Sequence, residues 1–103
     1  MLNNKFGIAP ESFDIILTVL KTFSQVEEVF IFGSRALATA KKGSDIDLCL
    51  KGKNVTALIA MDIAAILNEQ VAIPYFIDVL SYNDIDNKEL QNHIDRVGIR
   101  IYY

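Results

Sequence analysis

The sequence has little of the residues that build covalently cross-linked scaffolds. Its 103 residues include one cysteine, Cys49, and no tryptophan. A single cysteine cannot form an intrachain disulfide, and it cannot supply a cysteine-rich metal site. We therefore expect Cys49 to be a small buried residue, and any metal site to rest on oxygen ligands.

Long apolar runs and an excess of positive charge are also missing. No apolar run reaches the roughly 20 residues of a transmembrane helix, and the first seven residues lack the apolar core of a signal peptide. Lysine and arginine number 10 against 13 acids, which leaves a net charge of −3. This balance argues against stable nucleic-acid binding and against a membrane surface. We expect a cytoplasmic protein, and a nucleotide site remains compatible because bound cations neutralise carboxylates and phosphates.

What the chain does contain is typical of one folded domain over residues 1–103. It is 51% hydrophobic and 22% charged, which suits a packed core. Periodicity, prolines and glycines predict helices over 10–24, 55–69 and 84–97, a short helix over 34–39 and a turn at 41–44. Strands are predicted over 26–32, 45–51, 75–80 and 99–103.

This order of elements indicates an α/β (α+β) fold, with a small mixed sheet of three to four strands flanked by about four helices. The tight connection after the first strand allows antiparallel pairing with the second. The helix over 55–69 is long enough for a parallel crossover to the third. We expect Met61, Ile63, Ile66 and Leu67 to lie in the core, and His93 to be exposed or a helix-face contact.

Gly33-Ser34 stands where a predicted strand ends. Glycine lets the backbone approach a ligand closely, and the first amides of the short helix predicted after it can bind an anion with help from the serine hydroxyl. Alone, the pair is an ordinary strand-to-helix cap. Its position directly after an apolar strand predicts a phosphate site when acidic residues lie nearby.

Three aspartates supply those acids. Asp45 and Asp47 are two residues apart in a predicted strand, so their side chains share one face, and Asp78 interrupts the apolar strand over 75–80. Asp45-x-Asp47 alone can be an exposed strand face, and Asp78 alone can be an edge-strand acid paired with a lysine. Together they predict a site for one or two Mg²⁺ ions, where Asp78 can also accept the proton of an attacking hydroxyl.

These motifs resemble a known family. Phe32-Gly33-Ser34-Arg35-Ala36, followed by Gly43-Ser44-Asp45-Ile46-Asp47-Leu48, is similar to the signature of the minimal nucleotidyltransferases (MNT), the smallest branch of the DNA polymerase β-type superfamily. The resemblance implies the nucleotidyltransferase fold, Mg²⁺ on Asp45, Asp47 and Asp78, and ATP held by Gly33 and Ser34. It also places Arg35 and Ser44 near the nucleotide. Ala38 departs from the family, since many relatives have glycine there.

The resemblance further implies an activity and a partner. An MNT antitoxin transfers AMP from ATP to an acceptor hydroxyl, here a tyrosine of a helical HEPN-type toxin, because 103 residues leave no room for an acceptor-binding domain. Two alternatives stay open. The chain can be a weakly catalytic or non-catalytic nucleotide-binding antitoxin that occludes its partner, or an enzyme that modifies a small molecule such as an aminoglycoside.

Overall fold

A four-stranded mixed sheet forms the centre of the molecule. The computed structural model describes residues 6–41 and 43–103, so residues 1–5 at the start of the chain and Lys42 in the predicted turn lie outside it. The strands are β1 (Glu28–Phe32), β2 (Ile46–Lys51), β3 (Ile77–Ser81) and β4 (Ile99–Tyr102), in the spatial order β3-β2-β1-β4. As predicted, β1 and β2 are antiparallel and β2 and β3 are parallel, while β4 pairs antiparallel with β1.

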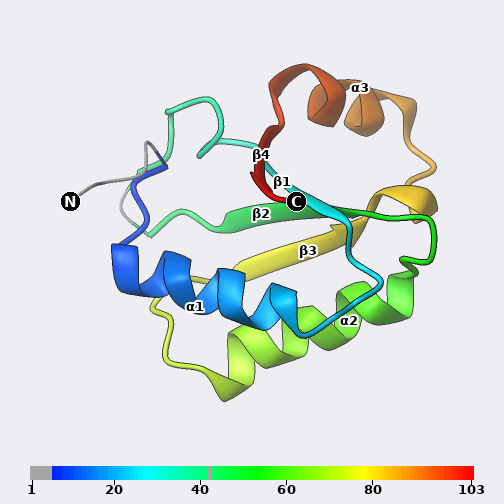
Figure 1. Cartoon of the computed structure of the whole chain (residues 1–103). Coiled ribbons are helices and arrows are strands. Elements are labelled where there is room, and N and C mark those ends of the chain that lie inside the picture. The colour runs from blue at the N-terminus through cyan, green and yellow to red at the C-terminus, as the bar shows by residue number, and fades with distance from the viewer. Residues whose placement is uncertain (1–5, 42) are drawn as a thin grey trace.

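The helices cover both faces of this sheet. Figure 1 shows α1 (Pro10–Lys21) and α2 (Ala57–Ala65) along one face and α3 (Lys88–Val97) on the other. The helix α2 continues as a π-helical turn, η1 (Ile66–Gln70), and a 3₁₀ turn, η2 (Tyr82–Asp84), follows β3. The α/β class and the mixed sheet are therefore as predicted.

Alternation along the strands divides the buried side chains into two clusters. Ile46, Leu48 and Leu50 belong to the larger cluster, together with the buried residues of α1 and α2. Cys49 belongs to the smaller cluster, packed with Ile94 of α3, and it is buried as predicted. Because side chains alternate along a strand, Asp47 shares the α3 face of the sheet with Cys49.

Four sequence predictions needed correction. Residues 34–39 form successive turns instead of a helix, and α3 begins at Lys88 instead of residue 84 because the Asn87 side chain caps it by accepting the Leu90 amide. Met61 was expected in the core but is 65% exposed, although Ile63 and Leu67 are fully buried as expected. Asp45 lies one residue before β2, which begins at Ile46.

In residues 6–41 and 43–103, no helix is long and apolar enough to cross a membrane.

Candidate nucleotide and metal site

Two of the predicted acids are neighbours across parallel strands. In the sheet register Asp47 of β2 pairs with Asp78 of β3, and Phe32 at the end of β1 pairs with Asp47 on its other side. Asp78 is exposed and Asp47 is half-buried. Asp45 is also exposed, just before β2. The three carboxylates thus gather where β2 and β3 begin and β1 ends.

The electrostatics of Asp47 reflect this gathering. Burial raises the pKa of the Asp47 carboxyl above its ordinary value, and the nearby Asp78 and Asp45 raise that pKa further, while His93 and Arg35 lower it. Each neighbouring carboxylate disfavours a second negative charge. A divalent cation at this point would relieve the repulsion.

Gly33 closes the site from the end of β1. Its φ is +74°, in the left-handed region that only glycine adopts without cost, and a Cβ atom built on it would collide with the Asp47 carboxylate oxygen Oδ2. The chain turns here so tightly that its backbone touches the carboxylate of the next strand. A side chain at residue 33 would therefore displace Asp47.

The turn that follows Gly33 is held by backbone hydrogen bonds. The Leu37 amide donates to the Gly33 carbonyl at 3.1 Å, and the Thr39 amide donates to the Ser34 carbonyl at 2.9 Å. Between them Ala38 has a φ of 61°, the one left-handed non-glycine residue in the described parts of the chain. This conformation suits glycine, and an alanine there costs about 1 kcal/mol.

Arg35 is buried, at 4% exposure, and among the residues that the structure describes its guanidinium donates to backbone carbonyls alone. Its acceptors are Phe6 and Gly7 on one side and Ser44 and Asp45 on the other, at 2.7 to 3.3 Å. The guanidinium also lies 5.0 Å from the centre of the Tyr75 ring. This geometry favours a role in fixing the loop that carries Asp45 over direct contact with a nucleotide.

Ser44 has a local role of the same kind. Its hydroxyl accepts the Lys41 amide at 2.9 Å, and its carbonyl accepts a hydrogen bond from Arg35. Both atoms stabilise the turn before β2. Contact between Ser44 and a nucleotide stays a prediction.

His93 was predicted to be exposed or to make a helix-face contact, and the structure shows that it makes a contact. Its Nε2 atom accepts the Gly33 amide at 3.2 Å, and its ring meets Phe32 edge-on at 6.1 Å between centroids. The only histidine of the chain thus reaches the turn where phosphate binding is predicted. A lone histidine in a polar helix gives no local signal of a partner 60 residues away, so the pattern could not have revealed this contact.

The acids suit Mg²⁺ in chemistry but do not form a closed set of ligands. In the described residues, no three His, Cys, Asp or Glu side chains converge closely enough to hold a metal ion. Burial is the main cause of the raised pKa of Asp47, and Asp78 and Asp45 add to it because each neighbouring carboxylate disfavours a further negative charge. Their oxygen atoms and the contact of Gly33 with Asp47 fit a hard cation shared with phosphate.

Comparison with known families shows which family this chain belongs to. A family model described as polymerase beta, nucleotidyltransferase matches residues 15–103. The chain belongs to this nucleotidyltransferase family. The match includes Gly33, Ser34 and all three aspartates.

Solved structures share the nucleotidyltransferase fold. A toxin–antitoxin structure with AMP-PNP aligns with a TM-score of 0.70 at 17% identity, covering 85% of this chain and 70% of that one. A mutant of the toxin–antitoxin MntA-HpeT aligns with a TM-score of 0.69 at 15% identity, covering 86% and 70%. A structure of a tri-AMPylated Shewanella oneidensis HEPN toxin with its MNT antitoxin aligns with a TM-score of 0.64 at 14% identity, covering 87% and 68%. No curated protein was found to match the sequence.

Proposed function

We propose that this nucleotidyltransferase is an MNT antitoxin that transfers AMP from ATP to a tyrosine hydroxyl of a HEPN-type toxin. The observation that carries the proposal is the register of β2 and β3, which sets Asp47 beside Asp78. Gly33 then brings a tight turn against the Asp47 carboxylate. Acids that face a phosphate-binding turn are the arrangement that nucleotidyl transfer needs.

Each residue of the site has a role in this proposal. Asp45, Asp47 and Asp78 hold Mg²⁺, which when bound offsets negative charge on the phosphates. Gly33 lets the backbone come close to the triphosphate, and Ser34 holds the triphosphate through its amide and its hydroxyl. Arg35 fixes the loop before β2, so that Asp45 is presented at the strand end.

Asp78 also accepts the proton of the attacking hydroxyl. It is the exposed member of the Asp47–Asp78 pair, so an acceptor can reach it from solvent. The tyrosine oxygen attacks the α-phosphorus of ATP, a new phosphorus–oxygen bond forms, and pyrophosphate leaves. A carboxylate in hydrogen-bond reach of that hydroxyl serves as the general base.

The acceptor is assigned by likeness to the aligned complexes. The aligned structures include a tri-AMPylated HEPN toxin in complex with an MNT antitoxin, and a toxin–antitoxin with AMP-PNP. Their TM-scores of 0.70 and 0.64 show that this chain shares their fold, and this shared fold supports an acceptor of the same class.

A transfer assay tests the proposal. ATP labelled at the α-phosphate is incubated with Mg²⁺, this chain and the HEPN-type protein from the adjacent reading frame. We expect label on the toxin with the wild type and with the control Asp62→Asn, because Asp62 is an exposed residue of α2. Asp47→Asn and Asp78→Asn should lower the rate at least a hundredfold. Equal labelling by Asp47→Asn and wild type would refute the catalytic assignment.

Two observations favour neutralisation by occlusion as the second candidate. Ala38 occupies a position that suits glycine, and the Gly33 amide is already bonded to His93. Both features would weaken phosphate binding. If Asp47→Asn abolishes Mg²⁺ binding yet still neutralises the toxin, occlusion is the mechanism.

A further inference from the structure

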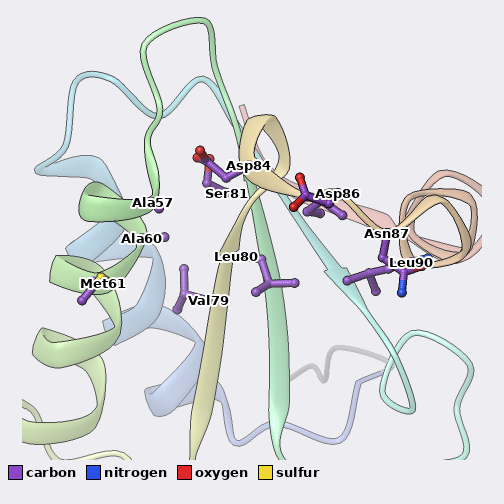
Figure 2. Close-up of a pocket in the computed structure, with 11 residues that line it drawn as sticks. Ala57, Ala60, Met61, Val79, Leu80, Ser81, Asp84, Asp86, Asn87 and Leu90 are labelled. Atoms are coloured by element: carbon purple, nitrogen blue, oxygen red, sulfur yellow. Dashed lines mark hydrogen bonds between the residues drawn. The ribbon is translucent and has the colours of Figure 1, made fainter.

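A groove runs along the free edge of β3, away from the three aspartates. It has a volume of about 480 Å³. Figure 2 shows Ala57, Ala60 and Met61 of α2 on one side of β3 and Leu80 and Leu90 on the other. We call it the β3 groove.

The floor of the β3 groove is a strand edge without a neighbour. β3 is the last strand of the sheet, and the Ile46 amide bonds to the Phe76 carbonyl at 2.9 Å. Alternate residues of a strand in a parallel ladder turn their amides and carbonyls to the same side. Phe76 and Asp78 therefore face β2, while Ile77, Val79 and Ser81 face outward.

The first outward residue is protected and the next is not. The Asn68 side chain bonds to both the amide and the carbonyl of Ile77, each at 2.8 Å, as a neighbouring strand would. No such side chain meets the outward amide and carbonyl of Val79 in the described part of the protein. An open strand edge is a template for pairing with an added strand.

Ser81 is the next outward residue of β3, and it also lines the β3 groove. Its side chain is buried at 4% exposure, and its Oγ is the one buried side-chain oxygen or nitrogen without a hydrogen-bond partner in the described residues. Because solvent does not reach this hydroxyl, the groups of Ser81 that an added strand can meet are its outward backbone amide and carbonyl.

The rim of the β3 groove is acidic. Figure 2 places the carboxylates of Asp84 and Asp86 at one end of it, and both residues are exposed. Neither forms an ion pair in residues 6–41 and 43–103. A second copy of this chain would bring acid against acid, whereas a basic segment would be attracted. Met61, which lines the β3 groove and is 65% exposed, offers an apolar surface to the same segment.

We propose that the β3 groove binds an extended basic segment of a partner protein, which adds to the sheet as a fifth strand beside β3. Its backbone bonds to Val79 and Ser81, and its lysines or arginines pair with Asp84 and Asp86. Backbone bonding supplies affinity and the alternate side chains supply specificity. This inference does not depend on transferase activity.

Peptide binding to the full chain tests it. The probe is a fluorescein-labelled eight-residue peptide of alternating valine and lysine, followed by anisotropy and by amide shifts in NMR spectra. We expect saturable binding that shifts the amide signals of Val79 and Ser81. A valine–glutamate peptide, and a valine–lysine peptide N-methylated on one edge, should bind at least tenfold more weakly.

Matched variants separate the β3 groove from general charge attraction. Ala57→Phe fills the β3 groove and should weaken binding at least tenfold, while Leu58→Phe changes a neighbour that is 70% exposed and does not line it. The pair Asp84→Lys and Asp86→Lys should abolish binding. Asp62→Lys with Glu69→Lys makes the same charge change on exposed residues outside the β3 groove. No binding to the folded wild type, or equal losses in both pairs of variants, would overturn the proposal.

Discussion

Single residues at the turn after β1 determine how closely the chain approaches the acids. Gly33 has a φ of +74° and lies against Asp47, and Ala38 reaches a φ of 61° five residues later. A close approach of the backbone at Gly33 could be predicted because glycine follows an apolar strand there, and the group that it approaches in the structure is the Asp47 carboxylate. The burial of Arg35 could not be predicted, since its acceptors include carbonyls 28 and 29 residues away.

Ala38→Gly should stabilise the fold. Glycine adopts a left-handed φ without the clash of a Cβ atom, so we expect the free energy of unfolding to rise by about 1 kcal/mol. Urea denaturation followed by circular dichroism measures it. The control Ala72→Gly, at an exposed residue with no left-handed φ, should lower stability instead.

His93→Phe should destabilise the fold. Phenylalanine retains a ring against Phe32 but cannot accept the Gly33 amide, whose bond to His93 is 3.2 Å long. We expect a loss of about 1 kcal/mol in the free energy of unfolding, measured by the same denaturation. Asn92→Phe adds a ring at the exposed neighbouring position without removing an acceptor, and an equal loss in that control would count against the contact.

At the scale of elements, pattern identifies the strands and helices but not their ends. All four strands lie inside or within one residue of the predicted ranges. The start of α3 differs because Asn87, a good N-cap, lies three residues after Asp84, where the helix was predicted to begin. The exposure of Met61 could not be read from α2, which is apolar on several sides, so periodicity does not single out its buried face.

The π-helical turn after α2 is bonded to β3, a contact that the sequence pattern does not predict. Asn68 in η1 donates to the carbonyls of Ala64 and Ile77 and accepts the Ile77 amide, which ties this turn to β3. Asn68→Ala should therefore lower the free energy of unfolding by about 2 kcal/mol, because the variant leaves partly buried groups unpaired. Asn92→Ala, at an exposed residue of α3, should change stability by less than about 0.5 kcal/mol. Thermal and urea unfolding of both variants test this difference.

At the scale of the whole molecule, the sheet brings together two acids that are 31 residues apart in the sequence, because its register pairs Asp47 with Asp78. The sequence motif predicted that these acids act together, and the predicted parallel crossover made their proximity plausible. The open edge of β3 and the contact of His93 with Gly33 depend on the packed tertiary structure, so no local sequence pattern predicts them.

The charge of Asp47 predicts a pH dependence of stability. Its folded-state pKa is raised by burial and by Asp78 and Asp45. A raised carboxyl pKa contributes stability below the unfolded-state pKa, and this contribution is lost as the pH rises through the folded-state value. Without metal, Asp47→Asn should therefore gain stability relative to wild type as the pH is raised from 4 to 7. Chemical denaturation at several pH values in EDTA measures this, and a constant difference between the two proteins would contradict it.

The most direct test of the nucleotide site is thermal unfolding at pH 7 with and without Mg²⁺ and a non-hydrolysable ATP analogue. A ligand that binds only the folded state raises the midpoint in proportion to its free energy of binding. We predict that Mg²⁺ and nucleotide together raise the midpoint of the wild type and of Asp62→Asn. Asp47→Asn should start from a higher midpoint and gain nothing from them. An equal gain in Asp47→Asn and wild type would contradict the assignment of Asp47 and its neighbours as the nucleotide and metal site.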